Sequence, residues 1–395
     1  MVTAPSLRLL PFALLLFILP FPGTVALRLL LLAMCFCIAL WAWWRVPGVS
    51  ATIPCKPVMG AWIVICMASL AYAFDASYTL GELKNELGYT MMAFFAFFAI
   101  AHERNNVVWL LRASGLGMVV IGVWAIGALV ANGMIWREGG GHGGTGVFAT
   151  YVVAIFAAQL WLTREDESPP LRRTALGLCV FAVVLAAATM QRAVWPVIAL
   201  QLVVLLLMAA RAGVVTLKRR TLVAAIGLVL AATAVGLVAI QQLRYGDFQE
   251  EQVQLKTDVR LKLWPKIVAR IAEHPLSGTG FGRGMIRKAY PDLTPVETPA
   301  LWHAHNVFLN YGLEMGVPGM LALGALFAGF GVLFWNAGSG PSSWVGVTGL
   351  VLLAGVVMRN QLNDFFIRDM SLLFWALIGL FARLAITPTQ GNRHA

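Results

Sequence analysis

The sequence predicts an all-α polytopic membrane protein of about twelve transmembrane helices with one large extramembrane loop. Hydrophobic residues make up 59% of its 395 positions, while charged residues make up only 12%, about half their share in a soluble domain. The mean hydropathy is +0.79, and apolar runs of about 20 residues, the length that a helix needs to cross a bilayer, recur along the chain. This composition excludes a soluble globular enzyme, a disordered chain and a disulfide framework.

Twelve apolar runs are interpreted as transmembrane helices. Short polar connections separate them, apart from a single long polar interruption at 243–305. We therefore divide the chain into nine spans within 1–242, a loop at 243–305 that contains a helix, and three spans within 306–395. The expected spans are 7–22, 25–44, 57–75, 83–101, 107–131, 147–162, 174–190, 193–211, 221–242, 306–335, 344–358 and 370–386.

The distribution of Lys and Arg predicts the orientation of the chain. Twelve spans place both termini on one side of the membrane. If that side is the cytoplasm, its short segments hold 14 basic residues and the short external loops hold six, as the positive-inside rule requires. The long loop 243–305 is then external, which in a bacterium means periplasmic. The net charge of +11 is mainly an orientation signal, and no nucleic-acid partner is expected.

A helix is predicted over 255–274 of the external loop. At 100° per residue, Arg260 falls within the apolar stripe formed by Trp264, Ile267 and Ile271, whereas the lysines of this helix face the other way. A guanidinium on a buried stripe is costly unless an anion compensates its charge. Arg260 is therefore half of a buried salt bridge, a snorkelling side chain, or a ligand for an anionic substrate.

Other external cations are also candidates for anion binding. Arg192 lies in a minimal turn between two spans, where an ionisable group is either functional or snorkels to the interface. The glycine-rich run 275–284 favours a tight backbone beside a ligand; Arg283 and Arg287 are either phosphate ligands or solvated charges. Guanidinium groups bind phosphate oxygens in bidentate pairs, so Arg192 and Arg260 aimed at one cavity would suit a pyrophosphate.

Two of the six histidines, His303 and His305, lie where the external loop meets the tenth span. A neutral histidine suits general-base catalysis because its usual pKa, about 6.5, lies near working pH. A structural hydrogen-bonding role and the start of a metal site are the alternatives. Further metal ligands at suitable spacing are missing nearby, so neither a metal nor another cofactor is expected.

The last external loop contains two aspartates and two arginines. Asp364 or Asp369 would either orient His305 or bind a sugar hydroxyl. Ion pairing with Arg359 and Arg368 is the simpler alternative, and we favour it.

The run 305–319 has the form His-Asn-x9-Gly-x2-Gly. It resembles the signature of bacterial O-antigen ligases, which belong to the O-antigen ligase/polymerase superfamily. The resemblance extends to Arg192 after the seventh span and to the segment 260–280. At the level of architecture it covers the whole chain, through the number of spans and the single large periplasmic loop, and it implies a GT-C-like fold.

The resemblance implies a metal-independent, inverting glycosyltransferase of the bacterial inner membrane. Such an enzyme moves a glycan from undecaprenyl pyrophosphate to a sugar hydroxyl of the lipid A-core at the periplasmic face, without a nucleotide sugar. At the matching positions, His305 would be the general base, and Arg192 and Arg260 would bind the diphosphate and stabilise the leaving-group charge. Its partners would be donor, acceptor and membrane lipids, and a monomer is expected. The further substrate-binding candidates are Arg283, Arg287, His303, Asn306 and Asp364.

Two other functions stay open. An O-antigen polymerase or a protein-directed oligosaccharide transferase would use the same donor with a different acceptor. A solute or lipid transporter is the more remote alternative, because transporters usually place ionisable residues near the membrane midplane. Here the candidate charges gather at the external edge of the spans.

Overall fold

The computed structural model describes residues 6–45, 52–133, 136, 141–164, 167–213, 218–245, 259–293, 303–339 and 343–387. Within these ranges all regular secondary structure is helical, which confirms the predicted all-α class. The longer helices are α1 (Leu10–Ile18), α2 (Val25–Arg45), α3 (Lys56–Ala68), α4 (Ala76–Glu82), α5 (Tyr89–Ile100), α6 (Arg104–Ala131), α7 (Thr145–Leu160), α8 (Pro169–Ala188), α9 (Val194–Arg211), α10 (Arg219–Tyr245), α12 (Val259–Glu273), α13 (Met285–Ala289), α14 (Val307–Ala337), α15 (Ser343–Leu362) and α16 (Arg368–Ile386).

Every expected span coincides with helix, but the count of twelve is not confirmed. Among the described residues, nine helices are long and apolar enough to cross a membrane: α2, α6, α7 with its 3-10 extension, α8, α9, α10, α14, α15 and α16. The expected spans at 7–22 and 57–75 correspond to shorter apolar helices, Leu7–Ile18 and Lys56–Tyr72. The one at 83–101 is formed by a π-helical stretch, Leu83–Gly88, that continues into α5.

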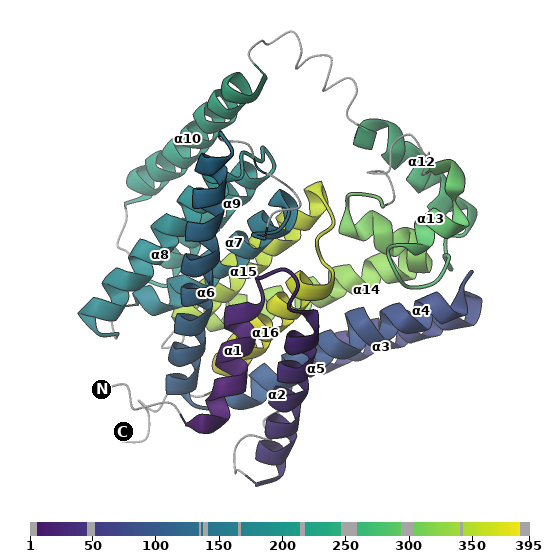
Figure 1. The fold of residues 1–395 in the computed structure, drawn as a ribbon, viewed down its shortest axis with the longest axis horizontal. Helices are drawn as coiled ribbons and strands as arrows, with labels where there is room; N and C mark the ends of the chain where they lie inside the picture. Colours follow the sequence, from purple (N-terminus) through teal and green to yellow (C-terminus); the bar gives the residue numbers. More distant parts are fainter. Residues whose placement is uncertain are drawn as a thin grey trace.

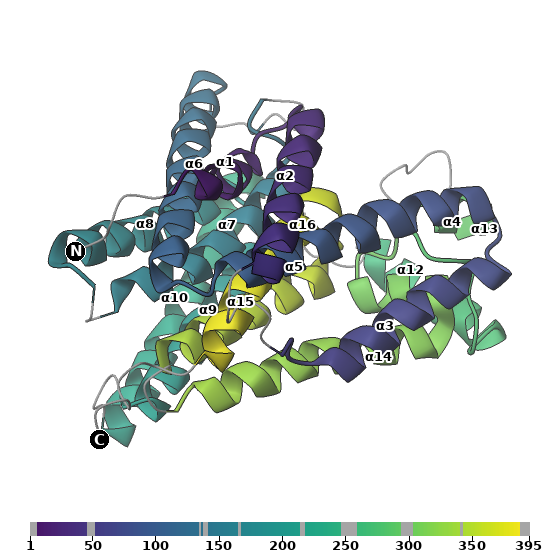
Figure 2. The same ribbon diagram turned by 90° about the horizontal axis from the view of Figure 1, so that it is seen from below.

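Aromatic side chains join α3, α5, α14 and α16, helices whose arrangement can be followed in Figures 1 and 2. The ring of Phe94 on α5 lies 5.8 Å from that of Trp375 on α16 and 6.1 Å from that of Phe330 on α14. Trp62 on α3 stacks on Trp375 at 5.5 Å. Because apolar groups gain no hydrophobic advantage against lipid tails, such close packing is what holds transmembrane helices together.

The helices α12 and α13 lie at one end of the bundle, where Figure 1 shows them beside α4 and the first half of α14. The predicted amphipathic helix is confirmed over Val259–Glu273, whereas positions 255–258 lie outside the described residues. Lys262 and Lys266 are exposed, as its periodicity predicts. Its apolar stripe belongs to a second, smaller core composed of Leu263, Ile267, Ile271, Ile286, Leu293, Ala304 and Leu313.

The helix α14 is kinked at Gly316, which has φ 69° and ψ −165°. The glycine-rich run 275–284 fits into this kink: the Val317 N–H donates to the Pro275 carbonyl at 2.8 Å, and the Thr279 N–H donates to the Leu313 carbonyl at 3.0 Å. Gly278 allows this close approach, because a Cβ there would lie 2.4 Å from the Leu313 carbonyl oxygen. Gly280 and Gly282 instead make room for residues 73–82, where a Cβ would meet Ala73 and Thr79 or Tyr78 and Glu82.

A methyl group at Gly316 should destabilise the protein. Its Cβ would lie 2.6 Å from the Pro275 carbonyl oxygen, and the positive φ is itself unfavourable for alanine. We expect Gly316→Ala to lower the free energy of unfolding by at least about 2 kcal/mol. Gly324→Ala, on the same helix, is the matched control because its Cβ would meet only Phe308, at 3.7 Å. Thermal unfolding in detergent compares the variants; equal melting temperatures would contradict the account of the kink.

Candidate active site

Several predicted site residues lie on three segments that contact one another: the start of α14, the C-terminal end of α15 and the turn between α8 and α9. Asn306 begins α14 as its N-cap, because its side-chain Oδ1 accepts hydrogen bonds from the Phe308 and Leu309 N–H groups at 2.9 and 3.1 Å. Its Nδ2 donates to Gln361 Oε1 of α15 at 3.1 Å. These contacts give Asn306 a structural task, and substrate binding by it stays a prediction.

Asn363 fixes the tautomer of His305. The two side chains are joined by a hydrogen bond of 3.0 Å between His305 Nδ1 and Asn363 Oδ1. The same Oδ1 also accepts the Asp364 N–H at 3.0 Å, which identifies it as the amide oxygen. In the neutral side chain His305 Nδ1 must therefore carry the proton, and Nε2 is the unprotonated ring nitrogen. The backbone of His305 is in the left-handed region, with φ 53°, which marks a conformation fixed by its surroundings.

His303 is buried behind His305, with 6% of its surface exposed. Its Nδ1 accepts the backbone N–H of His305 at 3.0 Å, and the two ring centroids lie 4.0 Å apart. Burial, with smaller contributions from His305 and Arg283, lowers the pKa of His303 to about 2. Its side chain is therefore neutral and a poor proton acceptor at working pH.

This shift makes the stability of the protein depend on pH. Below the usual pKa of about 6.5, an unfolded chain binds a proton at His303 that the folded protein does not, so stability falls as the pH falls. Between pH 6.5 and pH 5 this group should remove up to about 2 kcal/mol from the free energy of unfolding. His303→Gln, which keeps an acceptor for the His305 N–H, should lose this dependence. Denaturation curves at both pH values measure the free energy of unfolding of wild type and variant. The same change with pH in both proteins would contradict the prediction.

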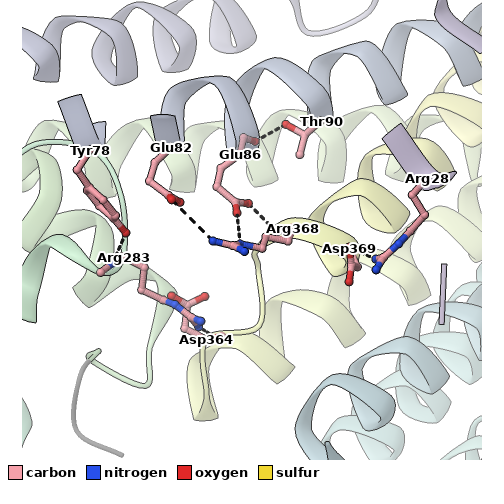
Figure 3. A network of polar contacts seen from close by, with 10 residues as sticks. Arg28, Tyr78, Glu82, Glu86, Thr90, Arg283, Asp364, Arg368 and Asp369 are labelled. Atoms are coloured by element: carbon pink, nitrogen blue, oxygen red, sulfur yellow. Dashed lines mark hydrogen bonds and ion pairs between the residues drawn. The ribbon is translucent and has the colours of Figure 1, made fainter. Parts of the chain in front are cut away.

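Asp364 is buried within a hydrogen-bond network beside the start of α14. Its carboxylate accepts hydrogen bonds from Asn310 Nδ2 and from the Phe366 N–H, while its backbone carbonyl accepts one from Arg283 (Figure 3). The predicted pairing of Asp364 with an arginine of its own loop is thus wrong. Asn310 in turn accepts the Ala304 N–H at 2.8 Å, so this network supports the backbone next to His305.

The other charges of this loop also find partners elsewhere (Figure 3). Asp369 forms an ion pair with buried Arg28 of α2. The Arg368 guanidinium lies 3.9 Å from Glu82 and 3.8 Å from Glu86, and the backbone N–H of Arg368 donates to Glu86 Oε2 at 2.6 Å. Next to this network is a polar cavity of about 30 Å³, with room for one or two waters, whose lining includes Glu82, Glu86, Arg283, Glu314 and Asp364.

Arg359 links α15 to the turn that carries Arg192. Its Nη2 donates to Gln191 Oε1 at 2.6 Å, and Gln191 Nε2 donates to Thr145 Oγ1 at 2.7 Å. Arg192 is the next residue and is half-buried. The minimal turn predicted between the two spans is confirmed, since α8 ends at Ala188 and α9 begins at Val194.

Arg260 is brought to the same region by α12. Trp264, one helical turn further on, donates its indole N–H to the Ala304 carbonyl at 2.8 Å, which anchors α12 beside the histidines. Arg260 is half-buried, and its charge acts on the guanidinium of Arg359. Arg359, at the end of α15, is thus contacted by Gln191, the neighbour of Arg192, and is also affected by the charge of Arg260.

Not every predicted residue belongs to this centre. Arg287 on the short helix α13 is exposed, while Arg283 reaches inward to Asp364. Gln191, Arg359 and Asn363 belong to it but were not among the predicted site residues. In the part of the chain that the structure describes, His, Cys, Asp and Glu do not form a group of three or more suited to a metal ion; metal independence itself stays a prediction.

Fold and site together define a multi-pass helical membrane protein whose arginine, histidine and asparagine side chains gather at helix ends. Residues 177–324, which include Arg192, Arg260 and His305, match a family model described as O-antigen ligase. Over this segment the chain is similar to the O-antigen ligase family, which supports the resemblance to the O-antigen ligase/polymerase superfamily. The match ends before α15. Comparison with curated proteins gives no match.

Proposed function

We propose that the protein is an O-antigen ligase of the bacterial inner membrane. It transfers a glycan from undecaprenyl pyrophosphate to a sugar hydroxyl of the lipid A-core. In this proposal both termini are cytoplasmic, the loop 243–305 is periplasmic, and the enzyme acts as a monomer without a metal. The family match over 177–324 supports the reaction class, and the positive-inside distribution supports the orientation.

The observation that carries the mechanism is the hydrogen bond between His305 Nδ1 and Asn363. It leaves His305 Nε2 as the base that removes the proton from the acceptor hydroxyl. The acceptor oxygen then forms a bond to the anomeric carbon, and the bond from that carbon to the pyrophosphate oxygen breaks. A single displacement of this kind inverts the anomeric centre.

Arg192 and Arg260 bind the diphosphate and stabilise the negative charge that develops on it as undecaprenyl pyrophosphate departs. Fixed guanidinium groups suit this task because they stay charged at every working pH and match phosphate oxygens in bidentate pairs. Such preorganised charge is usually the largest contribution to catalysis. Arg283, His303, Asn306 and Asp364 support the site, and the exposed Arg287 is the weakest of the predicted substrate ligands.

The glycans made by cells that lack the gene distinguish a ligase from a polymerase or a protein-directed transferase. A ligase deletion should leave full-length O-antigen on its lipid carrier and none on the lipid A-core, with normal ligation restored by the wild-type gene. A loss of polymer length would instead identify a polymerase. An unchanged lipopolysaccharide together with a glycan missing from proteins would identify a protein-directed transferase.

A further inference from the structure

Arg359 is a buried cation that has no carboxylate partner among the described residues. Only 1% of its surface is exposed. Its hydrogen bonds go to three neutral oxygens: from Nε to Thr150 Oγ1 at 3.2 Å, and from Nη2 to the Gly146 carbonyl at 3.3 Å and to Gln191 Oε1 at 2.6 Å. None of the ion pairs formed by the described residues includes Arg359.

Two other buried arginines among the described residues are compensated by carboxylates. Arg28, at 3% exposure, pairs with Asp369, and Arg164, at 4% exposure, pairs with Glu167. An uncompensated charge inside a protein is costly, because it gives up hydration without gaining an opposite charge. The charge of Arg260 adds repulsion at Arg359. A fold that brings two guanidinium groups together in this way is suited to an anion that neutralises both.

The surroundings also hold the Arg359 guanidinium in place. Its Cζ lies 4.9 Å from the ring centroid of Phe365. The acceptors of its three hydrogen bonds lie on α7 and in the turn after α8. Further along the same helix end, Gln361 contacts Asn306 and Asn363 contacts His305. Arg359 lies in the last turn of α15, which ends at Leu362, and Asn363 is the next residue. A group bound at Arg359 is therefore close to the base.

We propose that Arg359 is a third diphosphate-binding residue, which acts with Arg192 and Arg260 on the pyrophosphate of the lipid-linked donor. This inference rests on the proposed function and deepens it. The protein supplies three fixed cations, and the substrate supplies the countercharge that Arg359 lacks among the described residues. Removal of the leaving group after transfer again leaves the cation uncompensated, which favours binding of the next donor.

Binding of farnesyl pyrophosphate to the purified full-length protein tests the inference, with farnesyl monophosphate as the comparison ligand. We expect Arg359→Gln to bind the pyrophosphate about 10- to 100-fold more weakly than wild type, with an unchanged or higher melting temperature without ligand. Arg28→Gln is the matched control, since it also removes a buried arginine. It should lower the melting temperature, because Asp369 loses its partner, but leave the affinity within about twofold of wild type.

Two results would overturn the role of Arg359 without affecting the proposed function. One is wild-type affinity in Arg359→Gln. The other is a loss of affinity that is equal for both ligands and accompanied by a lower melting temperature. In either case, weakened pyrophosphate binding by Arg260→Gln would leave the proposed function standing. Absence of any pyrophosphate binding by wild type, together with absence of glycan transfer, would overturn both.

Discussion

His305→Ala should abolish glycan transfer while the protein still inserts into the membrane. We expect the rate to fall by at least about 100-fold, because general-base catalysis typically contributes 10²- to 10⁴-fold. The reason is local: Asn363 holds the proton on Nδ1, so that only Nε2 is available to the acceptor hydroxyl. The measurement is the rate of transfer by purified variants, normalised to folded protein.

Two companion variants sharpen this test. Asn363→Ala should cause a smaller loss, mainly in kcat, because His305 remains but its tautomer is no longer fixed. His102→Gln should transfer at the wild-type rate, since His102 lies between α5 and α6 and contacts only its own turn. Normal transfer by a stably folded His305→Ala variant would remove His305 from the mechanism.

Arg260→Gln should have the second large effect, a fall of about 10²- to 10³-fold in the rate of transfer. Loss of this guanidinium removes a fixed charge at the point where the leaving group becomes negative. Lys262→Gln is the matched control: it removes a cation two residues away on the same helix, where the side chain is exposed. Both variants keep the apolar stripe of α12, so their melting temperatures should agree.

An equal loss of rate in Arg260→Gln and Lys262→Gln would show that the overall charge of α12 matters rather than the position of Arg260. Transfer by both variants at the wild-type rate would contradict a role for Arg260 in binding the diphosphate. Arg192→Gln should behave as Arg260→Gln does, because the proposal assigns both residues to the same group.

Several features of the fold and site were predictable because they depend on local sequence. The stripe of α12 follows from a helical period, and it correctly places Lys262 and Lys266 in solvent. Hydropathy alone also locates the long spans. The count of twelve is less secure, since the short apolar helices Leu7–Ile18 and Lys56–Tyr72 do not reach the length of a span.

The partners of the site residues depend instead on contacts between distant segments. His305 and Asn363 are 58 positions apart, and Gln191 and Arg359 are 168 apart, so no local pattern links them. For the same reason, the sequence suggested a pairing of Arg359 with an aspartate of its own loop, whereas the nearest hydrogen-bond acceptors come from other helices. The polar run that starts at Arg359 was the available signal, because it is unusual at the end of an apolar span.

The glycine-rich run 275–284 shows a further limit of local reasoning. Its spacing correctly indicates a tight backbone, but the partners of that backbone are α14 and residues 73–82. Likewise, Arg283 and Arg287 look alike in sequence, yet one reaches the Asp364 carbonyl and the other is exposed. The local sequence around α13 does not determine which of these two charges faces inward.

The most direct test of the central claim is glycan transfer by the purified protein in the presence of excess chelator. The reaction contains an undecaprenyl-pyrophosphate-linked glycan and lipid A-core, and the product is the glycosylated lipid A-core. We predict transfer that persists in chelator and is lost in His305→Ala. Absence of this product with both substrates present, or transfer that stops in chelator, would contradict the account.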